Sequence, residues 1–183
     1  EASPPSRFGC FPDRDSAGMS GESIRAYVGL GGNVGDVEDT MMEALMVIDG
    51  LPQTSIRVQS RLYRSPPWGR TDQDDFINAV VELRTRLAAR VLLDYLLEVE
   101  AKFGRVRGDG DKWGPRTLDL DLLTFGEEIL DLPGMHVPHP HLHERAFVLV
   151  PLAEIAATLQ IPGRGQVGDL LAAIDSSGIE AID

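Results

Sequence analysis

The 183-residue sequence contains a single cysteine, Cys10, so no disulfide can form within the chain and a reducing, cytoplasmic setting is expected. It also lacks any apolar run approaching the roughly 18 residues of a membrane-spanning helix. Positive charge is scarce, since 17 Lys and Arg residues face 29 Asp and Glu residues and the net charge is −12. A general nucleic-acid binder needs a broad basic face, so this charge balance argues against that class.

The rest of the composition is that of an ordinary globular domain, with 43% apolar and 25% charged residues. Residues 1–20 differ, because they are rich in Pro, Ser, Gly and Asp and show no periodicity. We therefore predict a disordered tail over 1–20, with Met19 as a candidate natural start, and one domain over 21–183. We expect this domain to be a monomer that binds small molecules.

The order of predicted elements indicates an α+β fold. Apolar periodicity and turn residues predict strands at 24–31, 55–65, 76–86 and 118–124, and helices at 37–49 and 88–103. The order βαββαβ is typical of a ferredoxin-like fold, in which an antiparallel sheet carries helices packed on one face. The predicted helices 145–157 and 166–175 are C-terminal additions to this core.

Positive charge is concentrated in one glycine-rich segment, 102–116. Five cationic side chains lie there against two acidic ones, namely Lys102, Arg105, Arg107, Lys112 and Arg116 against Asp109 and Asp111. Such a segment suits a polyphosphate ligand.

An alternation of apolar and acidic residues, Leu118 to Leu122, follows directly. In a strand, Asp119 and Asp121 share one face and lie roughly 6.5–7 Å apart along the chain. Two carboxylates so placed can hold Mg²⁺, which prefers oxygen ligands. The alternative is a half-exposed edge strand whose acids face water. The adjoining cationic segment favours the metal site.

Six fragments in this order resemble a known family: GGN at 31–33, YRSPPWG at 63–69, FINA at 76–79, GRVR at 104–107, WGPRTLDLD at 113–121 and VPHP at 137–140. With Arg145 and Phe147 they resemble the 6-hydroxymethyl-7,8-dihydropterin pyrophosphokinases of folate biosynthesis, from about residue 25 to 175. The resemblance implies transfer of the terminal diphosphate of ATP to the pterin hydroxymethyl oxygen, with release of AMP.

The resemblance also implies roles for individual residues. The metal ligands for two Mg²⁺ ions are Asp119 and Asp121, which form the catalytic set together with Arg105 and Arg116. The co-substrate ATP is assigned to Glu100, Arg105, Arg116, Leu122, His139 and Arg145. The pterin is assigned to Ser65, Pro66, Trp68, Phe76, Asn78, Trp113 and Phe147.

Elementary chemistry agrees with the pterin assignment. The rings of Phe76 and Phe147 can sandwich a flat heterocycle, and Asn78 offers both a donor and an acceptor to its edge. Taken alone, each Phe is more typical of an ordinary core than of a ligand pocket. The sequence departs from the family in having Gly32 where serine is usual and Leu97 where some members carry glutamine.

All four histidines lie between His136 and His143. Such tracts often bind transition metals. Pro138 and Pro140 favour an irregular segment with diverging imidazoles, so only His139 is assigned to phosphate.

Two other functions remain open from the residues alone. A nucleotidyltransferase also uses paired aspartates but attacks the α-phosphorus of ATP. A ferredoxin-like ligand-sensing or RNA-binding module would not need the acidic pair and would expose a basic, aromatic sheet face.

Overall fold

The computed structural model describes residues 19–105 and 114–182. Its elements are β1 (Met19–Gly32), α1 (Val37–Asp49), β2 (Thr54–Gln59), β3 (Tyr63–Ser65), β4 (Phe76–Leu87), α2 (Ala89–Lys102), β5 (Asp119–Phe125), β6 (Leu130–Leu132), β7 (Met135–Val137), the 3₁₀ helix η1 (Leu142–Glu144), α3 (Ala146–Ala156), β8 (Gln160–Ile161), β9 (Gly165–Gln166), α4 (Val167–Ala172) and β10 (Glu180–Ala181). No helix in this described part is long and apolar enough to cross a membrane.

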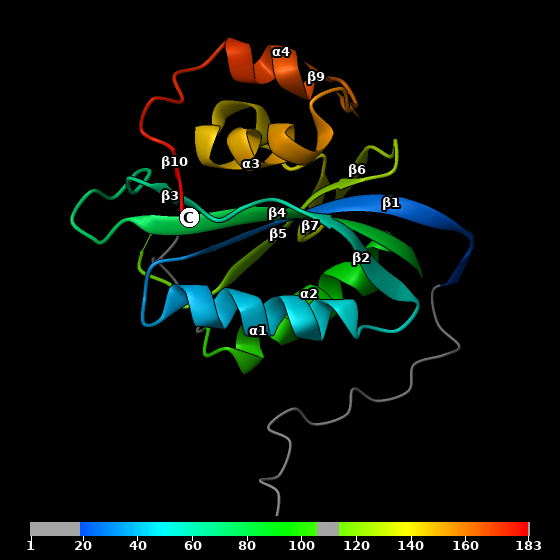
Figure 1. Cartoon of the computed structure of the whole chain (residues 1–183). Helices are drawn as coiled ribbons and strands as arrows, with labels where there is room; N and C mark the ends of the chain where they lie inside the picture. Colours follow the sequence, from blue (N-terminus) through cyan, green and yellow to red (C-terminus); the bar gives the residue numbers. More distant parts are fainter. Residues whose placement is uncertain (1–18, 106–113, 183) are drawn as a thin grey trace, which may run out of the picture.

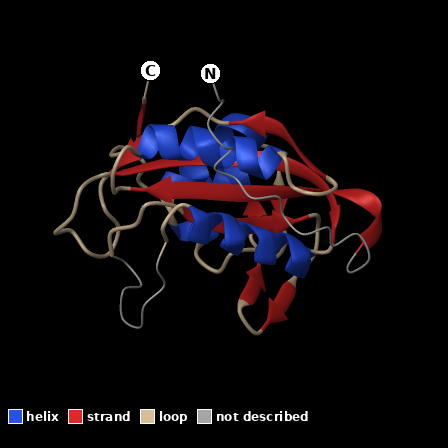
Figure 2. Cartoon of the chain, turned by 90° about the horizontal axis from the view of Figure 1, so that it is seen from below, coloured by secondary structure: helices blue, strands red, loops and turns tan. Residues whose placement is uncertain are grey.

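One antiparallel sheet organises the molecule (Figure 2). Its strands follow the order β10-β3-β4-β1-β5, and β2 pairs with the other half of the long strand β4. Strands β1 and β4 are central, and β5 pairs with the free side of β1. The predicted α+β, ferredoxin-like βαββαβ core is therefore confirmed.

Helices α1 and α2 cover one face of this sheet, as predicted (Figure 1). The Asp36 side chain caps α1 by accepting a hydrogen bond from the Asp39 amide at 3.2 Å. The apolar stripe of α1, with Met41, Leu45 and Ile48, is buried against the sheet. Burial of these stripes supplies the main apolar core.

The prediction that helices pack on one face is incomplete, because α3 and α4 cover the opposite face (Figure 1). Tyr27, Val80 and Leu123 point to that face and are buried against the α3 residues Leu149 and Leu152. The central strands are thus apolar on both sides, a pattern that requires a second layer.

The predicted strand 55–65 is in fact two strands, β2 and β3. Ser60 lies between them, where its hydroxyl accepts a hydrogen bond from the Val80 amide at 3.0 Å and interrupts the regular ladder. Strand β1 begins at Met19, inside the segment predicted as a tail, whereas residues 1–18 lie outside the described residues. The division into a tail and one domain stays a prediction.

Candidate active site

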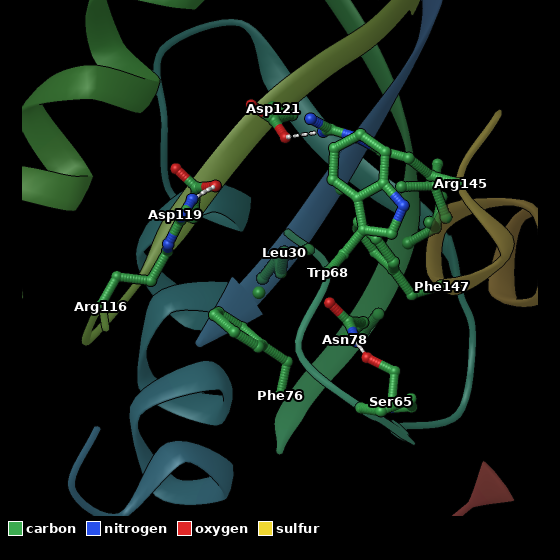
Figure 3. A pocket seen from close by; sticks show the side chains of 16 residues that line it. Leu30, Ser65, Trp68, Phe76, Asn78, Arg116, Asp119, Asp121, Arg145 and Phe147 are labelled. Atoms are coloured by element: carbon green, nitrogen blue, oxygen red, sulfur yellow. Dashed lines mark hydrogen bonds and ion pairs between the residues drawn. The ribbon is translucent and has the colours of Figure 1, made fainter. Parts of the chain in front are cut away.

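A pocket opens on the α3 side of the sheet (Figure 3). Its floor is formed by β1, β4 and β5, and its rim by the segment after β3 and the start of α3. On β1 the floor positions are Gly29 and Gly31, which leave room above the strand. A Cβ atom at Gly31 would lie 3.2 Å from the Asn78 side-chain oxygen, so a larger residue would crowd the pocket.

The two aspartates of β5 lie on the pocket face, and Leu118, Leu120 and Leu122 are buried on the other. The predicted alternation of this strand is therefore confirmed. Figure 3 shows Asp119 and Asp121 one after the other along β5, both turned toward the cavity. Their side chains keep 18% and 33% of their surface exposed.

Cationic groups surround both carboxylates. Arg116 Nη1 lies 2.6 Å from Asp119 Oδ2, and Arg105 Nη1 lies 3.4 Å from Asp119 Oδ1. Arg145 Nη1 lies 3.8 Å from Asp121 Oδ2, and His139 Nε2 lies 3.9 Å from Asp121 Oδ1. The structure thus brings together four of the residues assigned to ATP at the acidic pair.

Burial shifts the protonation of two of these groups. Desolvation, and then the neighbouring charge of Asp119, raises the pKa of Asp121 to about 7. Desolvation, and then the charge of Arg145, lowers the pKa of His139 to about 4. Asp121 therefore gains from any added positive charge, while His139 is neutral at pH 7.

The acidic pair fits a magnesium ion by its donor chemistry. It offers carboxylate oxygens, and the penalty on a charged Asp121 is relieved by a bound cation. No cluster of three or more His, Cys, Asp or Glu side chains suited to a metal occurs among residues 19–105 and 114–182. Magnesium is the divalent cation that suits so few protein ligands, because substrate phosphates and waters complete its shell.

Three aromatic rings line the same pocket, namely Trp68, Phe76 and Phe147. Figure 3 shows Phe76 and Phe147 on either side of Asn78, with Trp68 across the opening. Guanidinium groups lie over two of these rings. The Cζ atom of Arg116 lies 5.6 Å from the centroid of the Phe76 ring, and the Cζ atom of Arg145 lies 5.0 Å from the centroid of the Trp68 ring. The pocket therefore offers flat apolar walls next to charge.

Asn78 supplies the polar edge between these walls. It is 5% exposed, and its amide nitrogen donates a hydrogen bond to the Ser65 hydroxyl at 2.7 Å. Pro66 also lines the pocket. The structure thus brings six of the seven residues assigned to the pterin together, whereas Trp113 lies outside the described residues.

A second cleft adjoins the first and shares Asp121 with it. Leu93, Leu97, Leu122 and His139 contribute to its lining, between α2, β5 and β7. Its apolar walls are suited to a nucleotide base, with Asp121 at the junction where phosphates would cross.

Glu100 is placed differently from the other residues assigned to ATP. It is 1% exposed and lines neither pocket, and its Oε1 accepts a hydrogen bond from the Leu120 amide at 2.7 Å. It therefore holds β5 at the residue between the two aspartates.

Asn33 is a site residue to which sequence reasoning gave no role. Its Oδ1 accepts a hydrogen bond from the Arg116 amide at 2.9 Å, and its Nδ2 donates to Gln73 Oε1 and the Asp74 carbonyl, both at 3.0 Å. Neighbouring Gly32 permits this approach, since a Cβ atom there would meet the Thr117 carbonyl at 2.6 Å. The GGN motif was the available signal.

The pKa of Asp121 predicts a pH-dependent difference between wild type and Asp121→Asn without divalent cations. Its folded pKa of about 7 lies above the usual 3.8, so its contribution to stability is complete below pH 3.8 and is lost as pH rises through 7. The free energy of unfolding of the variant, relative to wild type, should therefore rise from about pH 4 to about pH 7. Denaturant titrations in a chelating buffer measure this.

His139 contributes the opposite slope in both proteins. Its folded pKa of about 4 lies below the usual 6.5, so its contribution is complete above pH 6.5 and is lost as pH falls through 4. The comparison of the two proteins cancels this contribution. Parallel stability curves would contradict the raised pKa of Asp121.

Comparison with known proteins assigns the chain to a family. Residues 27–157 match the family model described as 7,8-dihydro-6-hydroxymethylpterin-pyrophosphokinase. The 2-amino-4-hydroxy-6-hydroxymethyldihydropteridine pyrophosphokinase of Pseudomonas aeruginosa is 47% identical over 158 residues, which cover 86% of this chain and 96% of that protein. The enzyme of the same name from Methylorubrum extorquens is 45% identical over 87% of this chain and 99% of its own.

Solved structures agree on the fold. A wild-type Plasmodium falciparum HPPK-DHPS structure superposes with a TM-score of 0.64 at 12% identity, over 83% of this chain and 41% of that one. An HPPK-DHPS structure in complex with substrates gives a TM-score of 0.62 at 12% identity, over 82% and 43%. The chain spans less than half of these two proteins. On the sequence matches and this fold, the chain belongs to the 7,8-dihydro-6-hydroxymethylpterin pyrophosphokinase family.

Proposed function

We propose that this chain transfers the terminal diphosphate of ATP to the hydroxymethyl oxygen of 6-hydroxymethyl-7,8-dihydropterin, giving AMP and the pterin diphosphate of folate biosynthesis. The observation that carries the proposal is one pocket with aromatic walls and the Asn78 edge that ends at Asp119 and Asp121. Two small substrates fit the two adjoining clefts, which meet at Asp121.

The metal ligands are Asp119 and Asp121, and two Mg²⁺ ions are the expected complement. When bound, magnesium neutralises phosphate charge and lowers the pKa of a coordinated hydroxyl. In the free protein Arg105 and Arg116 neutralise Asp119 at 3.4 and 2.6 Å. A cation held by Asp119 would take over this charge balance, and the planar forks of both guanidinium groups are suited to phosphate oxygens.

His139 and Arg145 complete the phosphate ligands on the Asp121 side. His139 Nδ1 accepts a hydrogen bond from the His141 amide at 3.2 Å, so the neutral ring carries its proton on Nε2, the atom that faces Asp121. This N–H can donate to a phosphate oxygen without a change in the ring's charge. Leu122 and Leu97 offer apolar contact to the nucleotide from the second cleft.

Glu100 supports the nucleotide site indirectly. Its hydrogen bond to the Leu120 amide fixes the backbone between the two aspartates, so the spacing of the carboxylates depends on it. Direct contact of Glu100 with ATP stays a prediction.

Direct transfer between the substrates suits this pocket. Among its described lining residues the only hydroxyl is that of Ser65, which already accepts a hydrogen bond from Asn78, and there is no thiol. Phosphoryl-type transfer depends mainly on in-line positioning and charge stabilisation, which the arginines and His139 supply. We further infer a cytoplasmic location from the lone cysteine and an absence of nucleic-acid binding from the net charge of −12.

The deciding experiment is product analysis. ATP should yield AMP only when Mg²⁺ and hydroxymethyldihydropterin are both present, and mass spectrometry should find the pterin diphosphate. Pyrophosphate as the co-product would instead indicate nucleotidyl transfer at the α-phosphorus. Absence of any turnover with the pterin would refute the proposal.

Removal of a polar or an aromatic contact in the pocket should weaken the binding of the pterin and leave the binding of ATP unchanged. Phe147→Ala is expected to cost about 1–3 kcal/mol of pterin binding, from apolar contact and stacking together. Asn78→Ala should act in the same direction, because it removes the hydrogen-bonding edge. Calorimetric titrations of each ligand test this, and equal losses for ATP and pterin would indicate a folding defect.

A further inference from the structure

Trp68 differs from the other two aromatic residues of the pocket in the kind of backbone segment that carries it. Phe76 lies in β4 and Phe147 in α3, whereas Trp68 lies in the irregular segment after β3 and is 39% exposed. A ring on an irregular segment has no backbone ladder to fix it. Its position therefore depends on the side chains around it.

The side chains that contact the Trp68 ring include three among the described residues. The Arg145 guanidinium carbon lies 5.0 Å from its centroid, and the Phe147 ring meets it edge-on at 6.4 Å. The third contact is the His141 imidazole, whose centroid lies 6.1 Å away at an interplanar angle of 54°. Arg145 and Phe147 belong to the substrate pocket, but His141 does not line it.

His141 is itself fixed from two directions. Its Nδ1 lies 3.0 Å from Glu144 Oε2, one turn further along the 3₁₀ helix η1. Its backbone amide donates to His139 Nδ1 at 3.2 Å. The hydrogen bond from His141 also lowers the pKa of Glu144, so this carboxylate stays ionised and holds the imidazole.

We propose that His141, held by Glu144, is a positioning residue that keeps the Trp68 ring against Arg145 and Phe147 and thereby sets the affinity for the pterin. The inference rests on the proposed function of this pocket. His141 itself touches no substrate in this account.

Loss of the imidazole removes one of these contacts that order Trp68. The affinity for the pterin should fall, because the pterin is the substrate that packs against the Trp68 ring. Arg145 keeps its partner Asp121 at 3.8 Å. His139 loses its ring contact with His141, whose centroid lies 6.1 Å away, but keeps the hydrogen bond from the backbone amide of residue 141, so the nucleotide should be little affected. Separate effects on the two substrates are therefore the signature of this role.

The kinetic test uses His141→Ala, with His143→Ala as matched control. His143 lies on the same short helix, and its described contacts are with Arg164 at 2.9 Å and Glu144 at 3.5 Å. His141→Ala should raise the pterin KM about three- to tenfold, the size of one aromatic contact, with kcat and the KM for ATP within about twofold. His143→Ala should change none of these constants.

Rescue separates ring contact from general damage. His141→Phe keeps a ring against Trp68 without the bond to Glu144, so it should restore the pterin KM to within about twofold of wild type. Glu144→Ala should raise the pterin KM in the wild-type background and have no further effect in the His141→Phe background.

A fluorescence measurement is independent of turnover. In a Trp113→Phe background Trp68 is the only tryptophan, and its emission should shift to longer wavelength in His141→Ala but not in His141→Phe. An unshifted spectrum, a failure of His141→Phe to rescue, or equal rises in both KM values would overturn the inference. If the shift were seen but the unsubstituted chain formed no AMP with ATP, Mg²⁺ and pterin, the proposed function would be defeated instead.

Discussion

Replacement of Asp121 by Asn is expected to lower kcat by about 10²- to 10³-fold, because the variant loses several kcal/mol of metal-based charge stabilisation and each tenfold corresponds to about 1.36 kcal/mol. Asp121 is the residue common to both clefts, and Arg145 and His139 are arranged around its carboxylate. The substitution keeps the side-chain shape and removes the charge. Steady-state AMP formation at saturating ATP, pterin and Mg²⁺ measures the effect.

The fold of the variant should be intact, since a partly buried carboxylate with a raised pKa is replaced by a neutral amide of the same shape. Asp131→Asn is the matched control. Asp131 is a similar carboxylate that pairs with His136 at 2.6 Å, but its side chain is 87% exposed in the β6–β7 hairpin. A near-normal kcat for Asp121→Asn, or an equal loss in the control, would show that Asp121 holds no catalytic metal.

Arg116→Ala is expected to reduce kcat by about 10²-fold, the effect of one charge-stabilising group in the transition state. The backbone amide of Arg116 donates a hydrogen bond to the Asn33 side chain. The guanidinium group of Arg116 contacts Asp119 and lies over the Phe76 ring. It therefore lies between the carboxylates and the aromatic walls. Because charge on the transferred group changes during the reaction, its contact should matter more for turnover than for ATP affinity.

Two comparisons sharpen this test. Arg116→Lys keeps the charge but not the planar fork, so it should recover only part of the rate. Arg90→Ala removes a half-exposed arginine that lines neither cleft. It pairs with Asp94 at 3.2 Å and donates to the Pro133 carbonyl at 3.1 Å, and its loss should leave kcat unchanged. If the whole defect of Arg116→Ala lay in the dissociation constant for ATP, measured by calorimetry, the assigned catalytic role would be wrong.

The sequence alone determined the βαββαβ order of the core and the two faces of β5. Strand and helix periodicities are local, so the stripe of α1 and the alternation from Leu118 to Leu122 could be read from neighbouring residues. The sequence motifs could also indicate the pocket residues Ser65, Asn78 and Phe147, because the motifs occur along the chain in the same order as in the family that it resembles.

Tertiary structure decided what depends on distant contacts. Asn33 meets Arg116 across 83 positions, and Glu100 meets Leu120 across 20, and no local period encodes either pairing. The structure also placed a second layer of helices on the sheet, because its central strands are apolar on both faces. The prediction had placed helices on one face only. The raised pKa of Asp121 likewise required the packed protein. Desolvation depends on how the surrounding chain excludes water from the carboxylate, and the sequence neighbours of Asp121 do not reveal this.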